Sequence, residues 1–137
     1  LELFPTIPSP IGTSFAVGQT KNGYIQITNT GSDASSGTVT FLVSKVANFT
    51  MIVPPNMTMS GSTIVDNTAM TITDLGTIFL VTFNSTISAG GNIKLGYTLT
   101  ATGLKGSNGT LTAGLVNNSG GDSNSGNNTA IKLFGIN

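Results

Sequence analysis

The chain has 137 residues and a formal net charge of zero, and only 7% of its residues are charged, against about 25% in an ordinary domain. Because it carries no basic patch, nucleic acid is not an expected partner. No apolar run approaches the ~18 residues that a membrane-spanning helix needs, so no membrane span is expected. Cysteine is absent, and the fold must therefore form without disulfides.

The first ten residues are apolar and rich in proline. Their large apolar side chains are Leu1, Leu3, Phe4 and Ile7. Alternate positions along an extended segment project to one side, and Pro8 and Pro10 bias their predecessors away from helix. We interpret residues 1–10 as an extended tail and linker, and residues 11–137 as a β-sandwich head domain.

Two hypotheses describe this tail, and the residues leave both open. An exposed apolar segment is a liability, and inserting it as a donor strand into a groove on another copy removes that liability. Alternatively, the tail folds back as the first strand of its own domain. Pro5 cannot donate to a hydrogen-bond ladder. In an inserted strand it must therefore lie at a bulge or an end, or the paired part must run later, through residues 11–17.

Beyond the tail, apolar and polar residues alternate repeatedly, and no window sustains a 3.6-residue apolar period. Residues 77–83 are apolar on both faces, which is typical of a central strand buried on two sides or of a strand that borders a groove. Residues 57–65 fit no element clearly. The segments that predict strands are 24–30, 38–46, 49–53, 69–73, 77–83, 92–101, 109–116 and 129–136.

Short strands at this spacing, joined by Gly-rich turns, are typical of an antiparallel sandwich and argue against crossover helices. The sequence therefore predicts an all-β fold, namely an antiparallel Ig-like or pilin-like β-sandwich with an extended N-terminal donor strand.

Six Asn-x-Ser/Thr sequons offer acceptors for N-linked glycans. About four would arise by chance from the Asn, Ser and Thr content, so the excess is mild. Most of them fall where loops or strand ends are expected, and a charge-poor surface needs solvation from another source. The expected glycosylation sites are Asn48, Asn56, Asn84, Asn108, Asn117 and Asn127.

The composition offers little for catalysis. There is no His, Cys or Arg, and the five acids form no close pair in the sequence, so a general acid/base pair is hard to build. Ser and Thr are abundant, but only a lysine could activate one as a nucleophile. We therefore expect no catalytic residues, no cofactor and no enzymatic activity.

One loop has a partial metal-binding pattern. Asp122-Ser123-Asn124-Ser125-Gly126-Asn127 places oxygen-bearing side chains at alternate positions with a Gly at the bend, as at the start of a calcium loop. The distal bidentate Glu of such loops is missing, and the Gly, Ser and Asn content also describes a plain loop. The sequence accordingly predicts no metal site.

Four ordered segments carry a first family resemblance. They are Ile27-Thr28-Asn29-Thr30-Gly31, Leu75-Gly76-Thr77-Ile78, Ile87-Ser88-Ala89-Gly90-Gly91 and the closing Gly121-Asp122 with Asn127-Asn128-Thr129-Ala130. Together they resemble the Ig-like repeat domain of giant prokaryotic surface proteins, over roughly residues 22–134. The resemblance implies a surface-exposed sandwich that serves as a spacer or adhesion module and has no catalytic residues.

The whole chain also resembles the archaeal thread pilins and related bundling pilins, through its apolar N-terminal tail, its sequons and its few charges. That resemblance implies an extracellular cell-surface filament with a role in adhesion or biofilm, whose subunits join head to tail by donor-strand complementation. Copies of the chain and N-linked glycans would then be its partners, and Leu1, Leu3, Phe4 and Ile7 would belong to the donor strand. In the spacer alternative the same segment is an interdomain linker.

Overall fold

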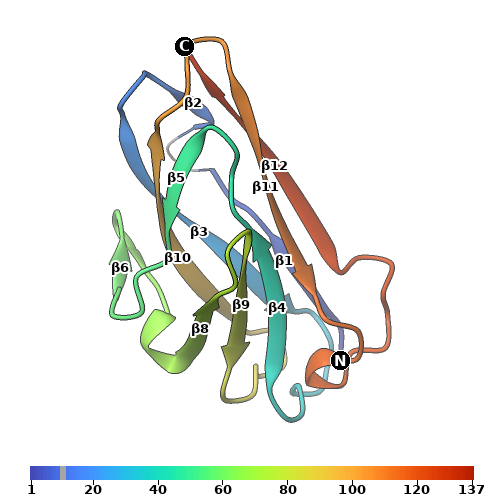
Figure 1. Cartoon of the computed structure of the whole chain (residues 1–137). Helices are drawn as coiled ribbons and strands as arrows, with labels where there is room; N and C mark the ends of the chain where they lie inside the picture. Colours follow the sequence, from blue (N-terminus) through green and yellow to red (C-terminus); the bar gives the residue numbers. More distant parts are fainter. Residues whose placement is uncertain (10–11) are drawn as a thin grey trace.

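The structure is a computed structural model and describes residues 1–9 and 12–137. These residues form an elongated sandwich of two β-sheets, with the N-terminus at one end and the C-terminus at the other (Figure 1). Two single turns of 3-10 helix, η1 (Asn67–Ala69) and η2 (Ser119–Gly121), interrupt loops, and no α-helix occurs in the described ranges. No helix there is long and apolar enough to cross a membrane.

One sheet has four antiparallel strands in the order β1-β3-β10-β5. Their bounds are β1 (Leu3–Thr6), β3 (Thr20–Asn29), β10 (Asn92–Ala101) and β5 (Phe49–Ile52). The two ten-residue strands β3 and β10 form the middle of this sheet, and the four-residue strands β1 and β5 form its edges.

The other sheet has six strands in the order β2-β12-β11-β4-β9-β8. Their bounds are β2 (Ser14–Phe15), β12 (Thr129–Ile136), β11 (Asn108–Leu115), β4 (Val39–Ser44), β9 (Ile78–Phe83) and β8 (Met70–Asp74). Its strands pair antiparallel, apart from β2, which runs parallel to β12. A small ribbon of β6 (Met59–Ser60) and β7 (Thr63–Ile64) lies beside β10.

The core lies between the sheets and follows from the alternation of apolar residues. Successive side chains of a strand point to opposite faces, so one face of each strand becomes apolar. Leu95 and Leu99 of β10 thus meet Phe41 of β4 and Leu111 of β11 within one buried cluster. Burying each such side chain contributes about 1.5–3 kcal/mol, and these residues therefore hold the two sheets together.

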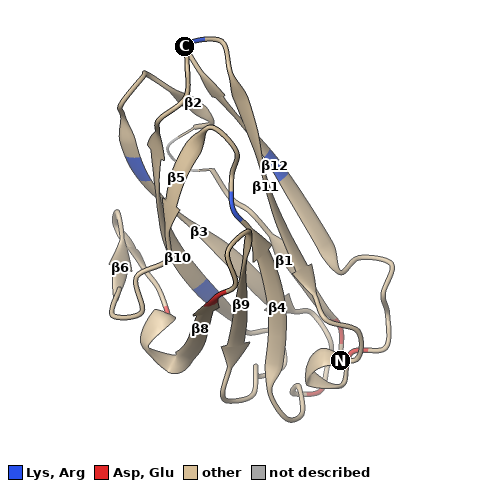
Figure 2. Cartoon of the chain, in the orientation of Figure 1, with Lys and Arg blue, Asp and Glu red and all other residues tan. Residues whose placement is uncertain are grey.

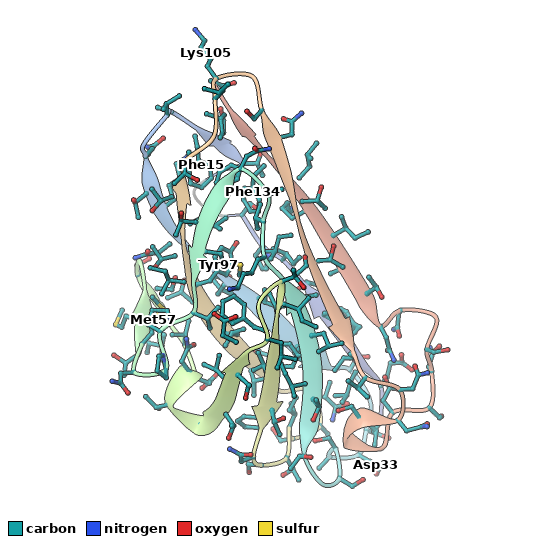
Figure 3. The ribbon with its side chains drawn as sticks, in the orientation of Figure 1. Phe15, Asp33, Met57, Tyr97, Lys105 and Phe134 are labelled. Carbon is teal, nitrogen blue, oxygen red and sulfur yellow. The ribbon has the colours of Figure 1, made fainter. Side chains whose placement is uncertain are left out.

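Three phenylalanines close the core at the end where the C-terminus lies. Phe15 packs edge-to-face on Phe49 and Phe134, with ring centroids 5.1 and 5.9 Å apart, a preferred geometry for aromatic pairs. Figure 3 shows Phe15 and Phe134 side by side at this end. The buried ring of Phe15 explains how a strand as short as β2 is held in the sheet.

The all-β sandwich predicted from the sequence is confirmed, and each predicted strand overlaps an observed one. Residues 57–65, which the pattern left unassigned, supply the ribbon of β6 and β7. The prediction that residues 77–83 are buried on both faces holds only in part. Phe79, Val81 and Phe83 are buried, but Ile78 and Leu80 are half-exposed, because their side chains alternate onto the face of the six-stranded sheet that points away from the core.

Candidate functional site

The N-terminal segment is a strand of its own domain in this single chain. Strand β1 pairs antiparallel with β3, with Leu3 opposite Asn29 and Thr6 opposite Gln26. This pairing corresponds to the hypothesis that the tail folds back as the first strand of its own domain. Exchange of β1 between copies involves a second chain, and it stays a prediction.

The side chains of this segment alternate between core and surface. Leu3 and Ile7 are buried in the core, Pro5 is buried between them, and Leu1 packs against the core while partly exposed. Phe4 lies on the opposite face and is half-buried. Pro5 is tolerated because β1 is an edge strand, where a missing N–H donor can face away from the ladder.

The other candidate for an inserted strand, residues 11–17, contains β2, and its exchange between copies stays a prediction. Ser14 and Phe15 form β2 and pair with β12. The predicted boundary between tail and head domain falls at Pro10 and Ile11, which lie outside the described residues.

A buried asparagine fastens the start of β1. Asn29 is fully buried at the end of β3, and its side-chain oxygen accepts hydrogen bonds from the backbone N–H of Glu2 (3.3 Å) and Gly31 (3.1 Å). Its amide nitrogen donates to the carbonyl oxygens of Asp33 (2.9 Å) and Ile87 (3.1 Å). One side chain therefore joins β1 to two loops.

Glu2 also ties β1 to the loop between β11 and β12. Its Oε1 accepts hydrogen bonds from the side-chain amides of Asn124 (3.0 Å) and Asn127 (2.7 Å). Carboxylate acceptors make stronger hydrogen bonds than neutral ones. The long polar loop is therefore held against the N-terminal segment.

Two glycines let the chain approach β1 closely. A Cβ at Gly31 would collide with the backbone of Leu1, and one at Gly120 would lie 2.8 Å from Cδ1 of Leu3. Gly120 also has a φ of +62°, which only glycine adopts at no steric cost. The close packing around residues 1–3 thus depends on glycine at both positions.

All six sequon asparagines are exposed. Five lie in turns or loops, and Asn108 is the first residue of β11. Some of their side-chain amides already donate: Asn48 to the carbonyl of Asn108 (2.8 Å), and Asn84 to Oγ1 of Thr71 (3.1 Å). The amide of Asn127 likewise donates to Glu2 (2.7 Å). All six residues are accessible at the surface, and their occupancy stays a prediction.

The ionisable groups are sparse, and the lysines are scattered over the surface (Figure 2). Figure 2 shows sparse charges, with acidic residues gathered near the N-terminus. Lys45 and Asp74 form an ion pair at 2.9 Å. The hydrogen bond from Lys45, aided by one from the Gly76 N–H, lowers the pKa of Asp74 below its ordinary value of 3.8. Burial raises the pKa of Tyr97.

Within residues 1–9 and 12–137, no three His, Cys, Asp or Glu side chains come close enough to share a metal ion. Asp66 uses its Oδ2 to accept the backbone N–H of Lys94 (2.8 Å). Asp66 and Asp74 are therefore each engaged with a different partner.

The buried asparagines are the contacts that sequence reasoning missed. Asn67 is fully buried; its Oδ1 accepts the N–H of Gly96 (2.7 Å), and its amide donates to the carbonyls of Gly96 and Pro54 (2.9 Å each). Residues 27–31, which contain Asn29, carry a family resemblance, but nothing in that segment marks Asn29 as buried. Asn22 also begins no sequon and lies on the same strand, yet it is exposed, so no local feature of the sequence identifies the buried asparagines.

Several solved structures share this fold, although no protein-family model and no curated protein sequence matches the chain. A cohesin module from a family 33 glycoside hydrolase of Clostridium perfringens has a TM-score of 0.57 and 15% identity, covering 99% of this chain and 97% of that one. A CARDB domain from Pyrococcus furiosus, solved in complex with di-metal ions, has a TM-score of 0.56 and 13% identity, covering 99% and 88%.

A pilin shows the same sandwich. The major pilin subunit of Bacillus cereus has a TM-score of 0.54 at 8% identity, and the match covers 98% of this chain but 40% of the pilin. Identities this low establish the fold alone. The chain is therefore an Ig-like, cohesin-like β-sandwich that resembles CARDB and cohesin modules and one domain of a pilin.

Proposed function

We propose that this chain is a non-catalytic structural module of an extracellular surface protein, which spaces or presents neighbouring parts and contacts protein partners through its surface. The observation that carries the proposal is that β1 completes its own sandwich. Each copy is thereby a self-contained unit with its two ends at opposite poles (Figure 1). Fold likeness to a cohesin module and to a domain of a pilin supports this reading.

The surface supports an extracellular location. Few charges solvate it, and six exposed sequons offer places for glycans. We infer that Asn48, Asn56, Asn84, Asn108, Asn117 and Asn127 carry N-linked glycans. Intact-mass measurement of native material should exceed the 13.9 kDa of the bare polypeptide, and glycopeptide mapping should place the added mass on these residues. A native mass equal to that of the polypeptide would end this part of the proposal.

The association state tests the module reading. A domain that fills its own groove should be a monomer in solution, because β1 already covers the part of the core that a donated strand would cover. Light scattering coupled to size-exclusion chromatography should give the mass of one chain, and electron micrographs of native material should show no filaments built from this domain alone. Filaments would reject the spacer role.

A second candidate is a filament subunit that exchanges β1 between copies, as donor-strand assembly requires. The position of β1 favours it: this strand is short, lies at a sheet edge, and fills the core with Leu3 and Ile7. The same contacts made to a neighbour would form a heterologous, non-closing interface, which generates fibres. Partners would then be further copies of this chain.

Removal of residues 1–9 separates the two candidates. The truncated chain should lose stability in either case, because Leu3 and Ile7 leave the core. Adding a peptide of residues 1–9 should restore the melting temperature if the groove accepts a strand from another molecule. Exchange also requires that full-length chains convert to oligomers whose light-scattering mass increases with concentration. Full-length chains that stay monomeric at millimolar concentration would exclude the filament candidate.

A further inference from the structure

The loop between β11 and β12 contains two buried oxygen atoms without a hydrogen-bond partner. They are Oδ2 of Asp122 and Oδ1 of Asn128. Asp122 is 2% exposed and Asn128 is 5% exposed. Leaving a buried acceptor unpaired costs about 1–3 kcal/mol, and more when the group is charged. A ligand that paired with both oxygen atoms would remove this free-energy penalty.

Both side chains line the same hollow, which has a volume of about 160 Å³. The remaining lining also consists of oxygen-bearing side chains: Asn117, Asn118, Ser123 and Ser125. No apolar side chain lines it. An apolar ligand therefore has no apolar side chain to contact there, whereas a small polar ligand or an ion would find a lining of oxygen-bearing side chains.

The backbone holds the two central residues in place. Asp122 follows η2, and its N–H donates to the carbonyl of Ser119 (3.1 Å). Asn128 precedes β12, and its carbonyl accepts the N–H of Leu115 at the end of β11 (2.8 Å). The second carboxylate oxygen of Asp122, Oδ1, accepts the N–H of Asn124 (3.2 Å). Both unpaired oxygens thus belong to residues anchored at the root of a long loop.

Charge at this end of the molecule favours a cation. Acidic residues gather near the N-terminus (Figure 2), and Asp33 lies at the same end (Figure 3). Glu2 contacts the same loop through Asn124 and Asn127. Clefts lined by one sign of charge raise the local concentration of the opposite ion.

We propose that this hollow is a calcium site, with Asp122 and Asn128 as its central ligands. Calcium takes six to eight oxygen ligands in flexible geometry, including carboxylates, amide carbonyls and water. Magnesium demands near-ideal octahedral geometry, and zinc prefers nitrogen and sulfur ligands, which the sequence cannot supply because it contains no His or Cys. The missing distal Glu of a standard calcium loop is replaced by Asn128, whose amide oxygen lies at the far end of the loop.

A site with one central carboxylate should bind weakly, in the range of about 10⁻⁴–10⁻³ M that is typical of extracellular modules. At ten times its dissociation constant, calcium would shift the folding equilibrium by about elevenfold. For a domain of this size the melting temperature should then rise by roughly 4 °C. Calcium at about 10 mM is therefore enough to reveal the site.

The test compares three full-length chains in calcium titrations followed by thermal unfolding and by amide NMR spectra. In the wild type, the melting temperature should rise saturably, and resonances of residues 117–128 should shift. Asp122→Asn keeps the shape and the acceptor for Asn124 but removes the charge, and it should lose at least most of the response. Asp33→Asn is the matched control: it removes the same charge at the same end from an exposed residue outside the hollow, and it should respond like the wild type.

Three results would overturn the proposal: no saturable response in the wild type, shifts confined to residues outside 117–128, or an unchanged response in Asp122→Asn. Water that satisfies the two oxygens would give the first result. Should Asp122→Asn fail to fold, Asn128→Ser, which withdraws the amide oxygen, provides the second variant, and a wild-type response in that chain would equally reject the site. Magnesium at the same concentration should produce a smaller shift.

Discussion

Two fully buried side chains, Asn29 and Asn67, connect the loops to the sheets. Each uses its amide as donor and its oxygen as acceptor toward backbone groups. Buried polar groups are retained where they are paired in this way. The sequence contains 14 asparagines, and nothing local separates these two from the exposed ones. Their roles depend on partners far along the chain, such as Ile87 for Asn29, and this long-range pairing is why they escaped prediction.

Asn29→Ala should destabilise the domain by about 2–4 kcal/mol. The substitution leaves the N–H of Glu2 and Gly31 without their acceptor and the carbonyls of Asp33 and Ile87 without a donor, and unpaired buried groups cost about 1–3 kcal/mol each. Urea unfolding measures the change. Asn22→Ala, on the same strand but exposed, should stay within about 0.5 kcal/mol. Equal effects of the two substitutions would contradict the stabilising role of the Asn29 hydrogen bonds.

Asp74 makes a small part of the stability depend on pH. Its folded-state pKa is lowered by Lys45 and by the Gly76 N–H. A carboxylate of this kind stabilises the folded state above its unfolded value, here 3.8, and the contribution disappears as pH falls through the lower folded value. Melting temperatures measured from pH 7 to about pH 2.5 should therefore be higher for the wild type than for Asp74→Asn at neutral pH. The two curves should converge in acid; a constant gap would show that the pair does not titrate as described.

At the scale of elements, the alternating pattern located the strands because half-buried strands must alternate. Elements without that pattern were harder to predict. Strand β2 has two residues and depends on Phe15 meeting Phe49 and Phe134, a contact between distant parts of the chain. The position of β1 is unpredictable for the same reason: its apolar face predicts an extended strand that packs into a groove, but not which copy supplies that groove. The candidate calcium site shows only the partial pattern of residues 122–127 in the sequence, because Asn128 joins the proposed ligands through the fold.

Leu3→Ala should destabilise the domain by about 2–5 kcal/mol, the range for truncating a buried leucine. Leu3 is fully buried and packs into the shared core from β1. Leu133→Ala is the matched control on β12, because Leu133 is 58% exposed, and it should change the free energy of unfolding by about 0.5 kcal/mol or less. Chemical denaturation measures both. Similar losses in the two variants would mean that β1 is not packed as described.

At the scale of the whole molecule, both sheets and β1 share one hydrophobic cluster. Single domains of under about 150 residues usually unfold in one cooperative step, and we expect the shared core to couple the unfolding of β1 to that of the two sheets. Urea transitions followed by far-UV circular dichroism and by tyrosine fluorescence, to which both Tyr24 and the buried Tyr97 contribute, should coincide. An earlier transition in one probe would show that part of the sandwich, with β1 as the first candidate, opens separately.

The opposite placement of the two ends (Figure 1) determines how the domain would carry tension. A force that separates the termini pulls β1 along its own axis against β3, and β12 along its axis against β11. Hydrogen bonds between the sliding strands are then loaded together instead of breaking one after another. In single-molecule pulling through the termini, we expect a distinctly higher unfolding force than when the same domain is pulled through Lys105 and Asn137, which both lie at the end with the C-terminus (Figures 1 and 3). A domain built in this way should transmit load between its two ends without unfolding at low force.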